Sequence, residues 1–305
     1  MDIIPLNNGI ENIEIKNKKK FVPIDKKDNL KLYFTMLLLS PRGGGKTNCA
    51  INLCRYLQQE QLINEIYIIT TTFDNNNFED YLELKDENLF ININNTDDLN
   101  TSLKIIDDEI KHRLNRWKTT REQYTLKEYN KLYREILKKW FYYEKIKDEI
   151  DPQELYEYEL KDDETKILED NNYQIKQTYY ETIPSHILII DDIQGMYSNN
   201  KKSPLNNMLI RHRHKHLNII ILNQYLKDFP KILRSNIVYW GIFHFNDENV
   251  IRDIYEEIGN SISDSFEQFR EIYDTATKKS HNFLFIDCLD KSKKLRINFN
   301  YLIKY

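Results

Sequence analysis

Short apolar runs recur along this chain, and polar or amphipathic segments separate them. The runs are continuous rather than alternating, which is typical of parallel strands buried on both faces. Strands are predicted at Leu32–Leu39, Glu65–Thr72, Leu89–Ile93, Ser185–Asp192, Leu217–Leu222 and Ile237–Phe245. Between the first two runs, Lys46–Gln59 places apolar residues on one face of a helix. The pattern therefore predicts an α/β fold, with helices flanking a mostly parallel sheet.

The character of the chain changes between about Leu103 and Tyr180. This stretch is charged, rich in Tyr and Trp, and almost free of Gly and Pro. Aromatic residues spaced by three and four positions are typical of amphipathic helices. We therefore predict a helical insertion at 105–183, an α/β core at 32–104 and 184–305, and a polar N-terminal arm at 1–31. The arm carries Lys16–Lys20, which we interpret as a solvated segment or a contact for DNA or a partner.

The C-terminal part of the core is predicted to add two helices and two strands after Phe245. The helices are expected at Glu248–Ile258 and Ile262–Tyr273, and the strands at Phe283–Ile286 and Leu295–Phe299.

Composition narrows the classes of protein that this chain can belong to. The 305 residues carry a formal net charge of −4, so any DNA contact has to come from a local basic patch or a pore. Three cysteines in no metal-binding or disulfide pattern suggest an intracellular, reducing setting. No segment approaches the roughly 18 apolar residues of a membrane span, and no signal peptide is evident.

A phosphate-binding loop is predicted between the first strand and the first helix. It reads Ser40-Pro41-Arg42-Gly43-Gly44-Gly45-Lys46-Thr47, and Asn48 follows it. Backbone N–H groups at such a turn and the helix dipole attract an anion. Lys46 can reach the β- and γ-phosphates, and the Thr47 hydroxyl can bind Mg²⁺. Ser40 departs from the usual pattern, because glycine is common at this first position.

Two adjacent acids end the apolar run at 185–192. Strand ends of this kind meet ligands at the carboxyl edge of an open α/β sheet. We expect Asp191 to hold Mg²⁺ through water and Asp192 to polarise the attacking water. Many ATPases with a loop of this kind carry the longer Glu at the second position. Gln224 ends the next strand and is predicted to sense the γ-phosphate. The alternative is that these groups merely cap strand ends.

An arginine near the γ-phosphate would assist phosphoryl transfer. Arg234 and Arg42 are the leading candidates, each with an alternative role as a surface charge. The densest basic stretch, Arg211–His216, could contact DNA phosphates or simply end a helix.

The order of these motifs resembles the poxvirus-type genome-packaging ATPases of large DNA viruses and virophages, in the FtsK–HerA superfamily. Four stretches carry the resemblance, namely SPRGGGKT, ILIIDD, RHRHKHLNIIILNQY and FPKILRSNIVYWGIF. They contain an Arg-His pair (Arg211 with His212, or Arg213 with His214), Gln224, Pro230, Arg234 and Asn236. The resemblance covers roughly residues 32–104 and 184–245. It implies an ASCE-type (RecA-like) P-loop NTPase that uses ATP and Mg²⁺.

The resemblance also implies a function and partners. The protein would form a homo-oligomeric ring that drives double-stranded DNA into a preformed capsid, with a capsid or portal-vertex protein as partner and no membrane. The expected location is the host cytoplasm or a virus factory, or association with the virion. The alternatives are a terminase-like motor, a helicase, an AAA+ loader, and a nucleotide-dependent assembly factor that does not hydrolyse ATP.

Overall fold

The computed structural model describes residues 2–5, 30–71, 78–123, 126–147, 158–161, 164–165, 184–289 and 295–304. The chain divides into two compact units. Unit 1 comprises Met1–Ile110 and Ser185–Tyr305, and unit 2 comprises Lys111–Pro184. The lysines of the predicted N-terminal arm, Lys16–Lys20, lie outside the described residues.

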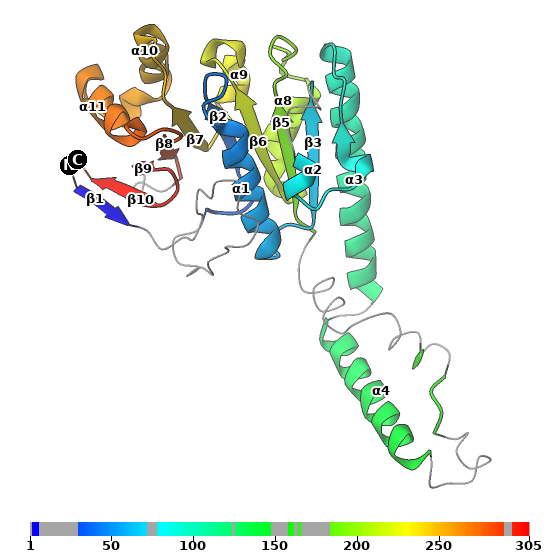
Figure 1. Ribbon diagram of the computed structural model, residues 1–305. Coiled ribbons are helices and arrows are strands. Elements are labelled where there is room, and N and C mark those ends of the chain that lie inside the picture. The colour runs from blue at the N-terminus through cyan, green and yellow to red at the C-terminus, as the bar shows by residue number, and fades with distance from the viewer. Residues whose placement is uncertain are drawn as a thin grey trace. The chain divides into compact units, whose positions relative to one another are not determined.

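Unit 1 is built on a ten-stranded sheet with the order β1-β10-β9-β8-β7-β2-β6-β5-β3-β4 (Figure 1). The parallel part consists of β2 (Thr35–Leu39), β3 (Glu65–Thr70), β4 (Leu89–Phe90), β5 (His186–Asp191), β6 (Leu217–Asn223) and β7 (Tyr239–Phe243). β2 lies between β6 and β7, and β6 separates β2 from β5. Each strand predicted from an apolar run is present, with ends that shift by a few residues.

The central strands are buried along their whole length, because helices cover both faces of the sheet. On one face lies α1 (Lys46–Gln59), whose Ala50, Leu53 and Leu57 are buried against Met36 and Leu38 of β2 and their neighbours. On the other lie α8 (Pro204–Arg211) and α9 (Lys231–Arg234) (Figure 1). This burial explains why the sequence shows continuous apolar runs instead of alternation.

Beyond β7 the sheet becomes antiparallel. β8 (Phe283–Asp287) pairs with β7, followed by β9 (Leu295–Ile297), β10 (Tyr301–Lys304) and β1 (Asp2–Pro5). The helices α10 (Glu248–Glu257) and α11 (Phe266–Thr277) connect β7 to β8. Sequence patterns predicted β8 and β9 but neither β10 nor β1, since strands of four residues carry too little periodicity to recognise.

The remaining short elements lie in loops of unit 1. They are the helix α2 (Phe78–Tyr81) and the 3-10 turns η2 (Asp86–Asn88), η3 (His212–Lys215), η4 (Leu226–Asp228) and η5 (Gly259–Ser261). The basic stretch thus follows an α-helix and includes a 3-10 turn, and the helix expected at Ile262–Tyr273 begins later, at Phe266.

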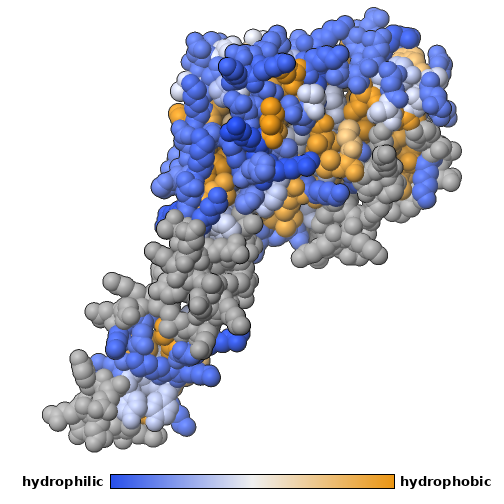
Figure 2. Space-filling view, turned by 180° about the vertical axis from the view of Figure 1, so that it is seen from behind, coloured by the Kyte–Doolittle hydropathy of each residue, from blue (hydrophilic) through white to orange (hydrophobic). Residues whose placement is uncertain are grey.

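Two long helices form the described part of the predicted helical insertion, whose residues 148–157 and 166–183 lie outside the described residues. These are α3 (Thr96–Gln123), which begins in unit 1, and α4 (Leu126–Ile146) in unit 2. α4 exposes three consecutive aromatic residues, Trp140, Phe141 and Tyr142. The exposed large apolar residues of unit 1 are scattered in the sequence, and the face in Figure 2 is mostly hydrophilic. Among the described residues, no helix is long and apolar enough to cross a membrane.

One buried hydroxyl fixes the end of β7. The Tyr273 hydroxyl of α11 donates to the carbonyl oxygen of Phe243 at 2.8 Å and accepts from the backbone N–H of Phe245 at 2.6 Å. Burial raises the pKa of Tyr273 to about 12, so the hydroxyl keeps its proton at physiological pH.

We expect Tyr273→Phe to lower the free energy of unfolding by about 1–3 kcal/mol, because two buried backbone groups lose their partner. Thermal unfolding checks this, with Tyr225→Phe as the matched control, since Tyr225 is 48% exposed. Equal melting temperatures for the two variants would contradict the role given to the Tyr273 hydroxyl.

Candidate functional site

The loop Ser40–Thr47, called the phosphate loop below, connects the carboxyl end of β2 to the amino end of α1. Its backbone turns sharply, with φ of 77° at Gly43 and 105° at Gly45. Side chains disfavour these angles, so glycine is needed at both positions. The helix that follows points its free N–H groups and positive dipole end at the loop, which is the geometry of an anion site.

Ser40 explains why glycine is also needed at position 44. The Ser40 side chain is fully buried, and its hydroxyl donates to the carbonyl oxygen of Pro41 at 2.9 Å. A Cβ atom added at Gly44 would lie 2.1 Å from the Ser40 Oγ atom. The serine at the usual glycine position therefore occupies the space beside Gly44, and the two positions constrain each other.

Lys46, Thr47 and Asp191 converge at the carboxyl edge of the sheet. Lys46 is 9% exposed, and the Thr47 hydroxyl lies 3.5 Å from the Asp191 Oδ2 atom, toward which it donates. Burial raises the pKa of Asp191 to about 6; the nearby charge of Lys46 opposes the shift and that of Asp192 adds to it. This carboxylate is thus destabilised in its ionised form, and a bound cation would relieve the cost.

The predicted catalytic acid and the predicted sensor are in direct contact. The Gln224 side chain donates from Nε2 to the Asp192 Oδ1 atom at 3.0 Å. Asp192 adopts a left-handed backbone with φ of 55°, and its carbonyl oxygen accepts from the Thr71 hydroxyl at 2.8 Å. An uncommon backbone angle held by two side chains fixes the direction of this carboxylate, as at many active sites.

The oxygen donors at this edge suit Mg²⁺. A hydroxyl from Thr47 and a carboxylate from Asp191 are hard ligands, and Mg²⁺ commonly takes one or two carboxylates and completes its shell with water and substrate phosphates. The buried, charge-crowded carboxylate of Asp191 is the observation that favours a cation here.

The two candidate arginines lie in different environments. Arg42 is exposed on the phosphate loop. Arg234 is mostly buried on α9, where its Nη1 atom lies 3.0 Å from the Glu257 Oε2 atom of α10.

The segment after Arg234 contacts the amino end of β2. Thr35, at that end, donates its hydroxyl to the carbonyl oxygen of Asn236, two residues beyond Arg234. Within the described residues, the charged partner of Arg234 is Glu257.

The basic stretch Arg211–His216 lies at the amino edge of the sheet, just before β6 begins. His212 is buried, and burial lowers the pKa of its ring. Lys215 forms an ion pair with Asp107, and His216 stacks on Tyr33 with ring centroids 5.0 Å apart. The exposed members are Arg211, Arg213 and His214. Half of the stretch is thus structural, and these three side chains face solvent.

Two residues at the phosphate loop escaped the sequence analysis. Asn223 is fully buried, and its carbonyl oxygen accepts from the backbone N–H of Ser40 at 3.1 Å. His281 precedes β8 and places its Nδ1 atom 3.3 Å from the carbonyl oxygen of Gly44. Asn223 could be suspected as the last residue of a buried strand, whereas no local signal marks His281.

The strand order and the site together define a P-loop NTPase of the ASCE (RecA-like) type. The phosphate loop follows β2, the acidic pair ends β5, and β6 with Gln224 lies between them. This confirms the fold class predicted from the sequence.

No protein-family model and no curated protein matches the sequence. Solved structures with a similar fold include the DNA-packaging ATPase from Sulfolobus turreted icosahedral virus, at 11% identity and a TM-score of 0.46, covering 88% of this chain and 98% of that one. The genome-packaging NTPase of Sulfolobus turreted icosahedral virus 2, in complex with AMP, shows 14% identity and a TM-score of 0.46, covering 87% and 95%.

A third similar structure is the cytoplasmic domain of the type VII secretion ATPase EccC from Thermomonospora curvata. It shows 10% identity and a TM-score of 0.44, covering 99% of this chain and 26% of that one. These similarities concern the fold alone.

Asp191→Asn should stabilise the protein at neutral pH in the absence of nucleotide. The pKa of Asp191 rises from 3.8 to about 6 on folding, so the native state binds more protons between these values and stability falls as pH rises. We expect the variant to melt a few degrees above the wild type at pH 8 and to lose this advantage near pH 4.5. Asp264→Asn is the exposed control. A gain that does not depend on pH would contradict the shift.

Gly44→Ala should weaken nucleotide binding at least about tenfold, since its Cβ would collide with Ser40. Ser40→Gly removes the colliding hydroxyl, so the double variant should recover part of the affinity. Isothermal titration calorimetry with MgATP on the two single variants and the double variant measures this coupling. Strictly additive losses would show that the two positions are independent.

Proposed function

We propose that this protein is an ATP-hydrolysing motor that translocates double-stranded viral DNA into a preformed capsid. The observation that carries ATP hydrolysis is the meeting of the phosphate loop with Asp191, Asp192 and Gln224 at one edge of the sheet. DNA packaging is supported by the motif order that resembles packaging ATPases, including the stretch around Gln224 and Arg234.

Each residue of the site has a defined task in this proposal. Loop residues from Ser40 to Asn48 bind the triphosphate, and Lys46 neutralises its β- and γ-phosphates. Thr47 and, through water, Asp191 would hold Mg²⁺, which supplies charge neutralisation at the phosphates. Asp192 orients and polarises the attacking water, and Gln224 fixes the Asp192 carboxylate.

Arg234 acts in this proposal on the nucleotide of a neighbouring subunit. Its charged partner is Glu257 of α10 and not a group of the nucleotide site, and both side chains keep partial exposure. Such an arginine makes hydrolysis depend on a neighbour, which links the subunits of a homo-oligomeric ring. Arg42, exposed on the loop, is the second candidate.

The DNA-contacting residues are proposed to lie in the exposed part of the basic stretch. Arg211, Arg213 and His214 could neutralise phosphates without giving the whole chain a positive charge. We further propose a capsid or portal-vertex protein as the partner and the host cytoplasm, a virus factory or the virion as the place of action.

We expect ATPase activity that rises with double-stranded DNA and is lost in Lys46→Ala and in Asp191→Asn. A size-fractionated oligomer is assayed for phosphate release with and without DNA, and thermal unfolding shows that each variant is folded. An oligomer that binds ATP but never hydrolyses it would refute the motor and favour an assembly factor. Metal-dependent DNA cleavage would favour a terminase-like enzyme instead.

Arg234→Ala should reduce hydrolysis by about a thousandfold or more, because a cation at the γ-phosphate is lost. Mixing it with Lys46→Ala subunits should restore activity, since each variant supplies what the other lacks. The control mixes Lys46→Ala with Asp191→Asn; both defects lie in the subunit's own nucleotide site, so mixing should restore far less. Arg234→Lys keeps the positive charge that pairs with Glu257. Low activity of this variant at an unchanged melting temperature would therefore report loss of function and not loss of the ion pair. If the mixture of Arg234→Ala with Lys46→Ala subunits regains no activity, Arg234 does not act between subunits.

A further inference from the structure

A pocket of about 540 Å³ opens beside the phosphate loop. One wall is Pro41–Gly44 of the loop, and the opposite wall comes from the end of β7 and the segment joining α11 to β8. The side chains of this second wall include His244, Asn246, Asp274, Thr277 and His281. Its volume is within the range of small-molecule sites, and its lining mixes hydrogen-bond donors and acceptors.

The position of the acids indicates which end of a nucleotide would lie in this pocket. β2 has β6 on one side and β7 on the other. The acids of β5 and Gln224 after β6 lie on the β6 side, so the metal and the γ-phosphate belong there. The remaining end of a nucleotide held by the loop then extends toward β7, where the pocket opens.

His281 lies against the loop from this side. Its backbone is left-handed, with φ of 63°, and its Nδ1 atom is 3.3 Å from the carbonyl oxygen of Gly44. A Cβ atom added at Gly45 would lie 3.1 Å from the same nitrogen. An exposed imidazole is thus held next to the phosphate loop on an uncommon backbone angle, within reach of a ligand that the loop binds.

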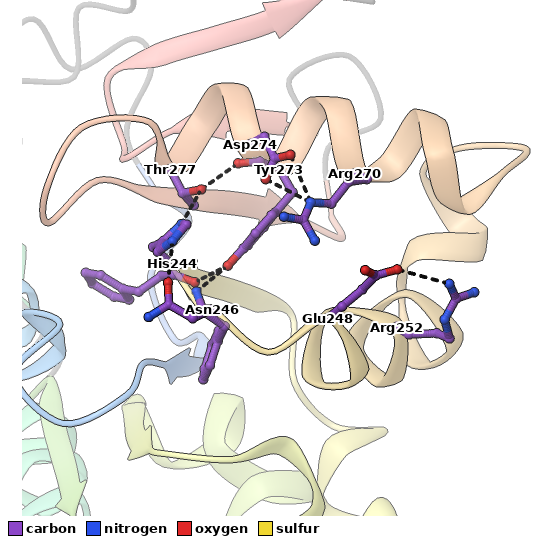
Figure 3. Close-up of polar contacts among 10 residues, drawn as sticks. His244, Asn246, Glu248, Arg252, Arg270, Tyr273, Asp274 and Thr277 are labelled. Atoms are coloured by element: carbon purple, nitrogen blue, oxygen red, sulfur yellow. Dashed lines mark hydrogen bonds and ion pairs between the residues drawn. The ribbon is translucent and has the colours of Figure 1, made fainter.

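The opposite side of the pocket is fixed by hydrogen bonds (Figure 3). The His244 ring lies 3.4 Å from the Thr277 hydroxyl through Nδ1 and 3.1 Å from the Asn246 Oδ1 atom through Nε2. The Tyr273 hydroxyl holds the backbone on both sides of His244. Arg270 donates to both oxygens of Asp274, at 2.9 and 2.8 Å. The polar groups are therefore positioned before any ligand arrives.

We infer that this pocket binds the base and ribose of the nucleotide, with the His281 ring packed on a purine base and the polar groups of Asn246 and Asp274 contacting its edge or the ribose. The inference rests on the proposed function only in that the phosphate loop holds the triphosphate. It makes the antiparallel extension part of the nucleotide site. Stacking favours purines because their two fused rings offer the larger face.

The test compares MgATP with magnesium tripolyphosphate, which has the phosphates but no nucleoside, by isothermal titration calorimetry. Wild-type protein should bind MgATP at least tenfold more tightly. His281→Gly, which suits the positive φ, and Asn246→Ala should each weaken MgATP binding at least fivefold while tripolyphosphate binding stays unchanged. His112→Ala, an exposed histidine of α3, is the control and should change neither affinity.

Each other outcome has a defined meaning. Equal affinity of the wild type for the two ligands, unchanged ATP binding by both variants, or an equal loss for both ligands would overturn the nucleoside pocket. Lys46→Ala should lose both ligands. If wild-type protein binds neither, the phosphate-loop function itself fails, which separates the two hypotheses.

Discussion

A buried carboxylate beside a phosphate loop is the constraint on which the site depends. The sheet delivers Asp191 into a place with little water, next to the charge of Lys46 and beside a second acid. Burial disfavours the ionised form of Asp191 in the absence of a cation, whereas the loop amides favour a negative charge. In the proposed function, a metal–nucleotide complex would supply both signs of charge, and the lower stability of the empty site would be the cost of binding it.

The central part of the fold could be predicted because its strands are buried on both faces. Continuous runs such as the one before Asp191 leave a strong signal, and the glycines of the phosphate loop leave another. The strands β10 and β1 give no such sequence signal, because they are short and β1 pairs only with a distant part of the chain. The predicted roles of Asp192 and Gln224 stay predictions, and the hydrogen bond between their side chains is a finding of the structure.

The other parts of the site depend on tertiary contacts that sequence does not encode locally. His281 reaches the loop across more than two hundred positions, and only the β7–β8 pairing brings it there. Arg234 is similar: its motif suggested a role at the γ-phosphate, but its ion pair with Glu257 of α10 follows only from the fold. Ser40 is a local case. It replaces the glycine that is usual at the first loop position, and the missing side chain of Gly44, four residues later, leaves room for it.

The pairing of Asp2–Pro5 with Tyr301–Lys304 bears on how this protein emerges from the ribosome. The parallel strands can assemble once β7 has left the exit tunnel, but β1 has to wait for residues translated some three hundred codons later. Contacts of such long sequence separation form late and slowly. Because the segment carrying His281 is also made near the end, a nascent chain would acquire its phosphate loop well before its complete nucleotide pocket.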